Sequence, residues 1–224
     1  PLSFYPQWQM RRTRDAARLK KQWRSDRRDG FEDQLQTVLE HIRDTGVCRS
    51  ADVGQGEKRG SGGWWDWHPS KTALEYLWRS GALHVVGREN FQKRYDLTKR
   101  VLDPQVWAAN AMPTEAQTIE WCCAGALDRL GFATSGEIAA FWAHVTAAEA
   151  KAWCANALKA GEIEEIEIEG ADGAIKSCFA RPDIGRDAAI DQPAPNRLRV
   201  LSPFDPALRD RKRAERLFGF HYRI

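Results

Sequence analysis

The chain has 224 residues, of which 42% are hydrophobic and 29% are charged, and its formal net charge is +3. This composition predicts a soluble globular protein with one large domain or two small ones. It argues against a membrane protein, because no run approaches the roughly 18 consecutive apolar residues of a membrane span. The basic start of the chain does not resemble a signal peptide, so we expect a cytoplasmic protein.

Basic residues gather at the two ends of the sequence. Residues 1–30 carry nine Lys/Arg and three Asp/Glu, and residues 197–224 carry eight and three. The stretch between them therefore holds 17 basic and 25 acidic residues, a net charge of −8. Basic ends around an acidic middle suggest a polyanion that is contacted at selected places. Solvated helix faces would produce the same pattern, and charge alone does not separate the two.

The cysteines and histidines do not show the spacing of a metal site. The five cysteines form no C-x-x-C pair, and the five histidines are scattered. We expect reduced, buried thiols and no structural zinc.

In chain order, residues 1–29 predict a basic helical linker, and residues 30–104 predict three helices followed by a hairpin. The first helix has an apolar stripe and ends at Gly46, and a short second helix begins at a Ser50 cap. The third helix follows Pro69. Alternating residues then predict a hairpin with its turn at Gly87–Asn90.

Residues 105–184 repeat this order, with helices that end at Gly131 and Gly161 and a hairpin turn at Asp172–Gly173. The helix between them begins at a Thr134 or Ser135 cap. Three helices and a β-hairpin describe a winged helix-turn-helix. The predicted fold class is therefore α+β, mainly α, with two tandem winged-helix units. A linker at 185–196 precedes a C-terminal segment, 197–224, which we expect to begin a β-containing part.

The two units differ in charge. Residues 47–103 hold ten basic and seven acidic residues, whereas residues 114–183 hold five and twelve. Phosphates would repel the second hairpin, which reads EIEEIEIEG. We expect the first unit to face DNA and the second to pack, to act as a spacer or to bind protein.

A glycine- and tryptophan-rich loop precedes the third helix of the first unit. Its tryptophans either pack on the helices or lie against DNA, where stacking is worth about 1–3 kcal/mol, and its glycines let backbone amides approach phosphates. The DNA-binding residues predicted in this loop, on the third helix and on the wing are Lys58, Arg59, Gly62, Gly63, Trp64, Trp65, Lys71, Arg88, Lys93 and Arg94.

The C-terminal segment adds a second basic cluster on a predicted helix that Asp205 would cap. Its side chains either form a solvated face or bind phosphates. The predicted contacts are Arg209, Arg211, Lys212 and Arg213.

Two stretches resemble the bacterial winged-helix DNA glycosylases of the YcaQ/AlkX/AlkZ type: GGWWDWHPSKTALEYLWRSGALHVVGRENFQKRYDLTKRVL and LSPFDPALRDRKRAERLFGFHYRI. The resemblance extends over essentially the whole chain, because PLSFYPQWQMRR also resembles a family segment. It implies tandem winged helices with a small β-rich C-terminal part. It also implies an N-glycosyl hydrolase that excises alkylated purines, including interstrand crosslinks, without a metal or organic cofactor.

The resemblance places catalysis in a Gln-x-Asp or Gln-x-Gln motif of the first winged helix, which steadies the developing oxocarbenium ion and positions a water. Two similar stretches occur here, QWQ from Gln7 to Gln9 and QLQT from Gln34 to Thr37. QLQT falls in the opening helix of the family's second winged helix, and QWQ just precedes that helix. We therefore expect the true motif upstream of Pro1 and no catalytic residue in this chain.

The sequence therefore predicts the DNA-binding scaffold of a DNA-repair glycosylase, inactive alone. We expect a monomer near the nucleoid that binds double-stranded DNA and no membrane or metal. The alternatives are a non-enzymatic winged-helix DNA-binding or regulatory protein and a protein-interaction scaffold that uses the acidic second unit.

Overall fold

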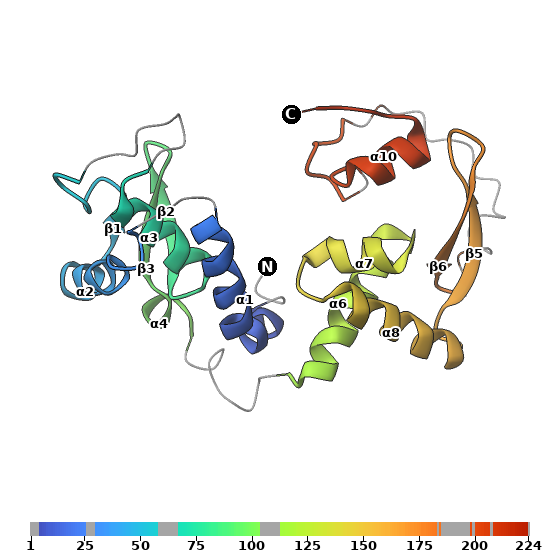
Figure 1. Ribbon diagram of the computed structural model, residues 1–224, viewed down its shortest axis with the longest axis horizontal. Helices are drawn as coiled ribbons and strands as arrows, with labels where there is room; N and C mark the ends of the chain where they lie inside the picture. The colour runs from blue at the N-terminus through green and yellow to red at the C-terminus, as the bar shows by residue number, and fades with distance from the viewer. Residues whose placement is uncertain are drawn as a thin grey trace. The chain divides into compact units, whose positions relative to one another are not determined.

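The computed structural model describes residues 5–25, 30–57, 67–103, 113–182, 184, 198, 200–206 and 208–223. The chain divides into two compact units, Pro1–Met112 and Pro113–Ile224 (Figure 1). Both combine helices with a small antiparallel sheet, which confirms the predicted class of α+β, mainly α.

The first unit contains four helices and three strands within the described residues. Its sheet has the order β1-β3-β2, and both pairs are antiparallel. In chain order the elements are α1 (Tyr5–Ser25), α2 (Leu35–Thr45), β1 (Cys48–Arg49), α3 (Pro69–Arg79), β2 (Leu83–Glu89), β3 (Gln92–Leu97) and α4 (Thr98–Val101).

Helix α1 contributes to the core of this unit. Trp23 is only 2% exposed, and its ring packs edge-on against Phe31 and Tyr76 with centroids 5.8 Å from each. The Tyr76 hydroxyl donates to the Ala16 carbonyl at 3.3 Å. Aromatic pairs in this geometry stabilise a core beyond the area that they bury. The basic helix predicted at the start of the chain is therefore real, and it packs on α3.

Two local predictions for this unit are wrong. Residues 50–57 form turns and bends in place of a second helix. The Asp52 carboxylate accepts from the Arg49 amide at 2.8 Å, and Gly54 and Gly56 have positive φ, so the chain closes locally. The hairpin turn lies at Asn90–Phe91, because β2 continues through Gly87 to Glu89 with an irregularity in the pairing at Gly87.

The second unit has the same sheet connectivity, β4-β6-β5. The Asp172–Gly173 turn is confirmed, since the Gly170 amide donates to the Ala174 carbonyl at 2.9 Å and Gly173 has φ 78°. The described elements are α6 (Glu115–Leu130), β4 (Phe132–Ala133), α7 (Ser135–Trp142), α8 (Ala147–Lys159), β5 (Glu164–Glu169), β6 (Ile175–Ala180) and α10 (Arg211–Phe218).

Reciprocal caps explain where the first three helices of this unit begin. Thr114, Thr134 and Thr146 each accept from a backbone amide three residues later, and the Gln or Glu at that position accepts from the threonine amide. Such capping boxes satisfy two donors that a helix end leaves unpaired. Thr134, and not Ser135, is thus the cap of α7.

The C-terminal segment differs from its prediction in two respects. Asp210 caps α10, because its carboxylate accepts from the Arg213 amide at 3.1 Å, so the prediction that Asp205 is the cap is wrong. The described residues from 198 onward contain α10 and no strand.

All five cysteines are free and buried, as predicted. Burial raises the pKa of Cys48 and of Cys123 to about 12. Within the described residues, no helix has the length and apolar character needed to cross a membrane.

Among the described glycines of the first unit, Gly81 is the position where a side chain is least tolerable. Its φ is +82°, and an added Cβ would lie 1.5 Å from the Trp8 ring. We expect Gly81→Ala to lower the free energy of unfolding of this unit by about 1–3 kcal/mol, because it combines backbone strain with displacement of α1. Chemical denaturation measures the change. Gly87→Ala is the control, since no atom lies within 4 Å of its added Cβ; equal losses in both variants would contradict this account.

Candidate nucleic-acid interface

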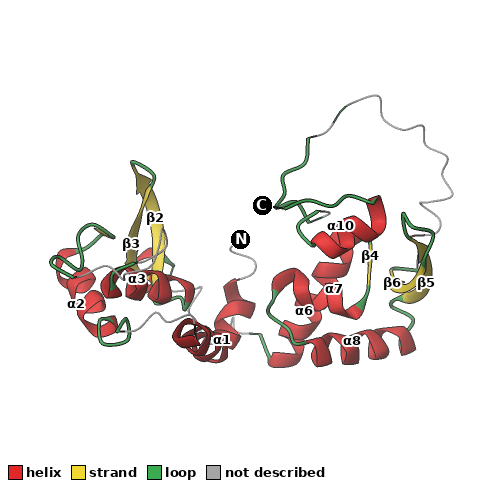
Figure 2. Cartoon of the chain, turned by 45° about the horizontal axis from the view of Figure 1, so that its top comes forward, coloured by secondary structure: helices red, strands yellow, loops and turns green. Residues whose placement is uncertain are grey.

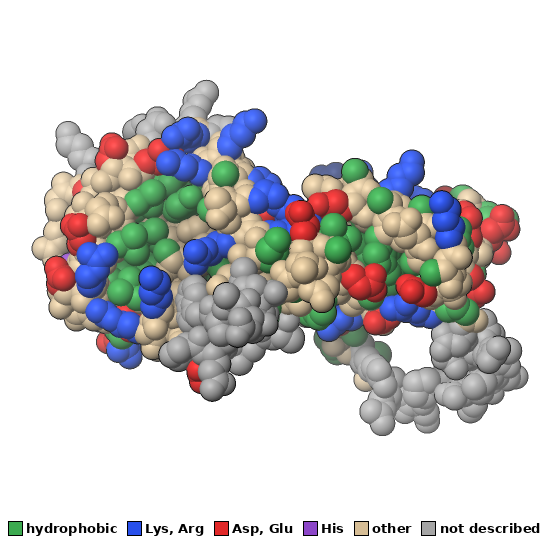
Figure 3. Space-filling view, turned by 90° about the horizontal axis from the view of Figure 1, so that it is seen from below, with side chains coloured by type: hydrophobic (Ala, Val, Ile, Leu, Met, Phe, Trp, Pro, Cys, Tyr) green, Lys and Arg blue, Asp and Glu red, His purple; other side chains and the backbone are tan. Residues whose placement is uncertain are grey.

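The first unit presents more basic than acidic side chains on its surface. Helix α1 alone contains seven Lys/Arg and one Asp, and Arg14 and Arg18 have side chains that are 42% and 65% exposed. Figure 3 shows Lys and Arg side chains on the visible face of this unit, at the left, with a few Asp and Glu side chains near its edge. A polyanion would therefore be attracted to the first unit.

Helix α3 is enclosed by its own unit. Seven of its eleven residues are buried, with α1 and α2 packed against it. Arg79 is the only exposed residue of the helix. Lys71, predicted to contact DNA, is half-buried with its ammonium 4.7 Å from the Trp67 ring centroid. Little of this helix is available to read base edges.

The N-terminus of α3 already holds a carboxylate. Glu57 accepts from the Ser70 amide at 2.9 Å and from the Ser70 hydroxyl at 2.6 Å, and its Oε2 lies 3.0 Å from His68 Nδ1. Burial alone would raise the pKa of Glu57, but the hydrogen bonds from Ser70 and His68 lower it below its ordinary value. This helix end, otherwise a ready anion site, is therefore occupied from within the protein.

Lys93, predicted to bind DNA, connects the β2–β3 hairpin to α3. Its ammonium lies 2.8 and 2.9 Å from the two carboxylate oxygens of Glu75 and 3.8 Å from the Trp78 ring centroid. The Tyr95 hydroxyl donates to the same carboxylate at 2.5 Å. Burial and this hydrogen bond raise the pKa of Tyr95. The chemistry of this cluster is structural, because every charge in it is matched.

Arg88 and Arg94 remain exposed on the hairpin. Arg88 pairs across the strands with Lys93, so it lies on the face of the hairpin that meets α3. Arg94 lies on the opposite face, since side chains alternate along a strand. The acidic residue nearest the turn, Glu89, accepts from Arg49 at 3.2 Å. The wing therefore presents one guanidinium on each face.

The loop residues predicted to contact DNA lie outside the described residues. They are Lys58, Arg59, Gly62, Gly63, Trp64 and Trp65. Glu57 and His68, which flank the segment, are fixed to the start of α3 by the contacts above.

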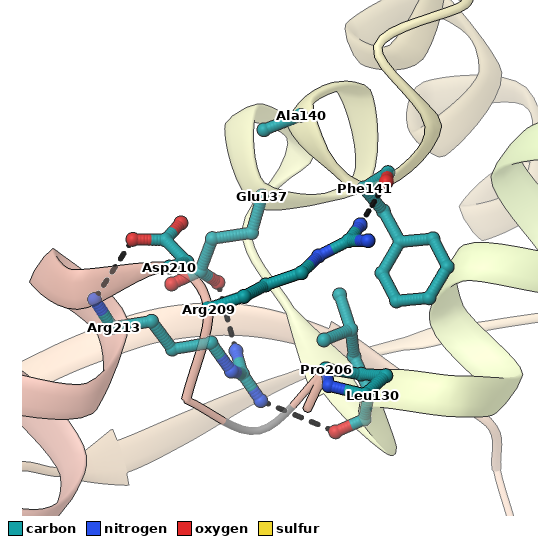
Figure 4. Close-up of a pocket in the computed structure, with 8 residues that line it drawn as sticks. All are labelled: Leu130, Glu137, Ala140, Phe141, Pro206, Arg209, Asp210 and Arg213. Carbon is teal, nitrogen blue, oxygen red and sulfur yellow. Dashed lines mark hydrogen bonds and ion pairs between the residues drawn. The ribbon is translucent and has the colours of Figure 1, made fainter. Parts of the chain in front are cut away.

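In the second basic cluster, Arg213 and Arg209 turn toward the protein (Figure 4). Arg213 is 4% exposed; its guanidinium donates to Glu137 at 3.0 Å and to the Leu130 carbonyl at 3.1 Å. Arg209 donates to the Phe141 carbonyl, with its guanidinium 4.3 Å from the centroid of that ring. These groups line a cavity of about 280 Å³. Arg211 and Lys212 of the predicted set are exposed, and the Arg211 guanidinium lies 5.4 Å from the Tyr222 ring centroid.

The two glutamine motifs lie in α1 and at the start of α2. Gln36 donates to Glu40 at 2.6 Å on the exposed side of α2, and Gln34 lies at the cap position of that helix. In the QWQ stretch, the Trp8 ring packs over Gly81. Within the described residues no cluster of three or more His, Cys, Asp or Glu side chains has the geometry to hold a metal ion.

Comparison with protein families decides the relationship. The family described as DNA glycosylase AlkZ-like matches residues 1–224. The chain belongs to the AlkZ-like DNA glycosylase family. Membership connects it with DNA-repair glycosylases and implies that it binds DNA. No solved structure matches the chain.

In this AlkZ-like chain, the sequence did not reveal which carboxylates bind the basic and polar groups inside the protein. Glu57, Glu75 and Glu137 each engage groups distant in sequence, so no local spacing reveals them. The only available signal was Glu137 at the third position of a capping box, which predicts a helix start and not a partner for Arg213.

A substitution of Glu137 tests the role of this buried ion-pair network. Burial would raise the pKa of its carboxyl, but the hydrogen bonds from Thr134 and Arg216 and the charges of Arg213 and Arg216 lower it. Its stabilising effect is therefore complete above the ordinary carboxyl pKa and is lost as pH falls through the lowered value. We expect Glu137→Gln to cost about 3–5 kcal/mol at pH 7, because Arg213 is left buried and unpaired.

The measurement is denaturant unfolding at pH 7 and at acid pH, where the deficit of the variant should shrink. Glu167→Gln on the exposed side of β5 is the control and should unfold like the unaltered chain. A variant deficit that is the same at every pH would contradict the assigned role of Glu137.

Proposed function

We propose that this chain is the DNA-binding scaffold of a glycosylase that excises alkylated purines, including N7 adducts and interstrand crosslinks. Its two units act as tandem winged helices, of which the first meets the duplex. One observation carries the proposal: in a chain of the AlkZ-like family, the first hairpin presents Arg88 and Arg94 on opposite faces, whereas the second hairpin exposes Glu165, Glu167 and Glu169.

The enclosure of α3 supports a binding mode that depends on the DNA backbone. Contacts to phosphate fix position and orientation, whereas sequence is read by side chains that reach base edges. With α3 largely buried, its unit has few side chains for base readout. This arrangement suits an enzyme that must find lesions in any sequence. It disfavours the alternative of a sequence-specific winged-helix regulator.

Two further groups complete the proposed interface. The tryptophan loop contributes Lys58 and Arg59, and its glycines bring backbone amides to phosphates. On α10, Arg211 and Lys212 contribute, since both are exposed. Arg209, Arg213 and Lys93 act indirectly, by holding α10 and the wing in position.

The first experiment measures how duplex affinity depends on salt. Each phosphate contact that is lost reduces the slope of log K against log salt by about 0.9. We expect Arg88→Ala combined with Arg94→Ala to reduce the slope by about 2 with little change in stability, because both side chains are exposed. Lys93→Met is the matched control on the same hairpin: it should lower stability and leave the slope nearly unchanged. An unaltered slope in the double variant would reject the wing as a phosphate contact.

The second experiment concerns catalysis. An N7-alkylated purine is cationic and already a good leaving group, so excision needs a carboxylate or amide beside the sugar and a positioned water. Gln34 and Gln36 lie at the start of a helix whose Gln36 is bound to Glu40. We therefore expect no release of base from an N7-alkylated duplex above the uncatalysed rate. Release that disappears in Gln36→Ala would show that QLQT is catalytic and would overturn this part of the proposal.

A further inference from the structure

The turn of the first hairpin exposes an aromatic ring. Phe91 is 95% exposed, the highest value among the large hydrophobic side chains of the described residues. Figure 2 shows the β2–β3 hairpin projecting beyond the helices of its own unit. A fully hydrated phenyl ring contributes nothing to a core, so the fold of this unit does not account for its presence.

The backbone at this turn is also strained. Asn90 and Phe91 have φ of 46° and 64°. A two-residue hairpin turn with both central residues in this region is normally Asn-Gly, because glycine adopts positive φ without a steric penalty. Asparagine tolerates the conformation, but a bulky aromatic residue there is an outlier. Glycine at position 91 would remove both the strain and the exposed apolar surface, and strain that persists in a fold is often tied to function.

The second hairpin is an internal comparison. It has the same place in an equivalent sheet, and its turn is Ala171, Asp172 and Gly173, with Gly173 at φ 78°. No aromatic residue lies between β5 and β6. The exposed ring and the strained turn therefore belong to the hairpin with exposed arginines and not to the acidic one.

The surroundings of Phe91 suit a polyanion. Arg88 donates to the Phe91 carbonyl at 3.1 Å, which keeps a guanidinium beside the turn. Arg94 lies on the other face of the hairpin, and Glu89 is paired with Arg49. A ring between two cations has the charge pattern of an element that enters a DNA groove, with phosphates on both walls and stacked bases at its floor.

We propose that Phe91 is a wedge that inserts between base pairs of the duplex, where Arg88 and Arg94 bind the phosphates on either side. The inference rests on the proposed function and assigns the wing tip a task within it. Insertion separates the bases of one step, and the ring replaces the lost stacking contact. Since separation requires the least work where pairing is already weak, the wedge gives preference for destabilised base pairs over intact ones.

The test uses the whole chain and a duplex that carries 2-aminopurine, whose fluorescence rises when it is unstacked, beside a mismatched pair. The unaltered chain should raise this fluorescence on binding. Phe91→Gly should abolish the rise and weaken binding to the mismatched duplex about tenfold, equivalent to about 1.4 kcal/mol. Binding to the fully paired duplex and its salt slope should stay unchanged, because no charge is removed. Phe91→Trp should restore the rise, since another aromatic ring can stack.

A measurement of unfolding and a control variant in the second hairpin complete the experiment. Phe91→Gly should unfold no earlier than the unaltered chain, so loss of folding will not imitate the effect. Ile175→Gly removes an exposed hydrophobic side chain from the second hairpin, 66% exposed, and should leave the fluorescence rise intact.

Three outcomes would overturn the inference. One is a fluorescence rise that survives in Phe91→Gly while duplex binding still depends on Arg88 and Arg94; the proposed function would then stand without the wedge. Another is a DNA-free oligomer that Phe91→Gly dissociates in sedimentation, which would make the ring a contact between protein chains. The third is absence of duplex binding by the unaltered chain, which would reject the wedge and the proposed function together.

Discussion

The Glu75 carboxylate is the group on which the arrangement of the first unit depends. It is nearly buried on α3, and a buried carboxylate is stable only where its charge is matched and its oxygens are hydrogen-bonded. Lys93 and Tyr95, both on β3, supply these partners. The requirement fixes the hairpin against α3 and directs Lys93 inward. As a consequence Arg94, one residue further along the strand, faces outward.

Glu137 has the corresponding role in the second unit. It completes the capping box of α7 and binds Arg213 and Arg216, which fixes α10 to the start of that helix. In both units a carboxylate on a helix pairs with a basic side chain and holds it away from the solvent. The basic residues of this chain therefore form two classes, those that hold elements together and those that remain at the surface. Membership in the AlkZ-like family implies that the protein binds DNA, a polyanion to which surface cations are attracted.

The two units have the same sheet connectivity but hairpins of different charge. Both have the short strand beside the second strand of a hairpin. The first hairpin exposes arginines and an aromatic turn, whereas the second exposes glutamates and a glycine turn. Glutamate side chains repel phosphates, whereas arginine side chains attract them. The enclosure of α3 by α1 adds a further constraint, because the helix that would read base edges in an open winged helix is packed within its own unit.

The sequence by itself determined the elements whose causes are local. The Thr134 cap, the glycines that end α2 and α6, the Asp172–Gly173 turn and the alternating strands are all encoded within a few residues, and the structure agrees with them. The charge difference between the units could also be predicted from the sequence, because it depends on composition alone.

Tertiary structure alone decided which basic side chains remain at the surface. Glu75, Glu57 and Glu137 find partners that short-range patterns do not specify. It also decided the hairpin register: the glycine at 87 predicted a turn, but pairing with β3 continues two residues further and places Phe91 at the tip. Local propensity is a weak determinant where cross-strand hydrogen bonds and a buried carboxylate set the register.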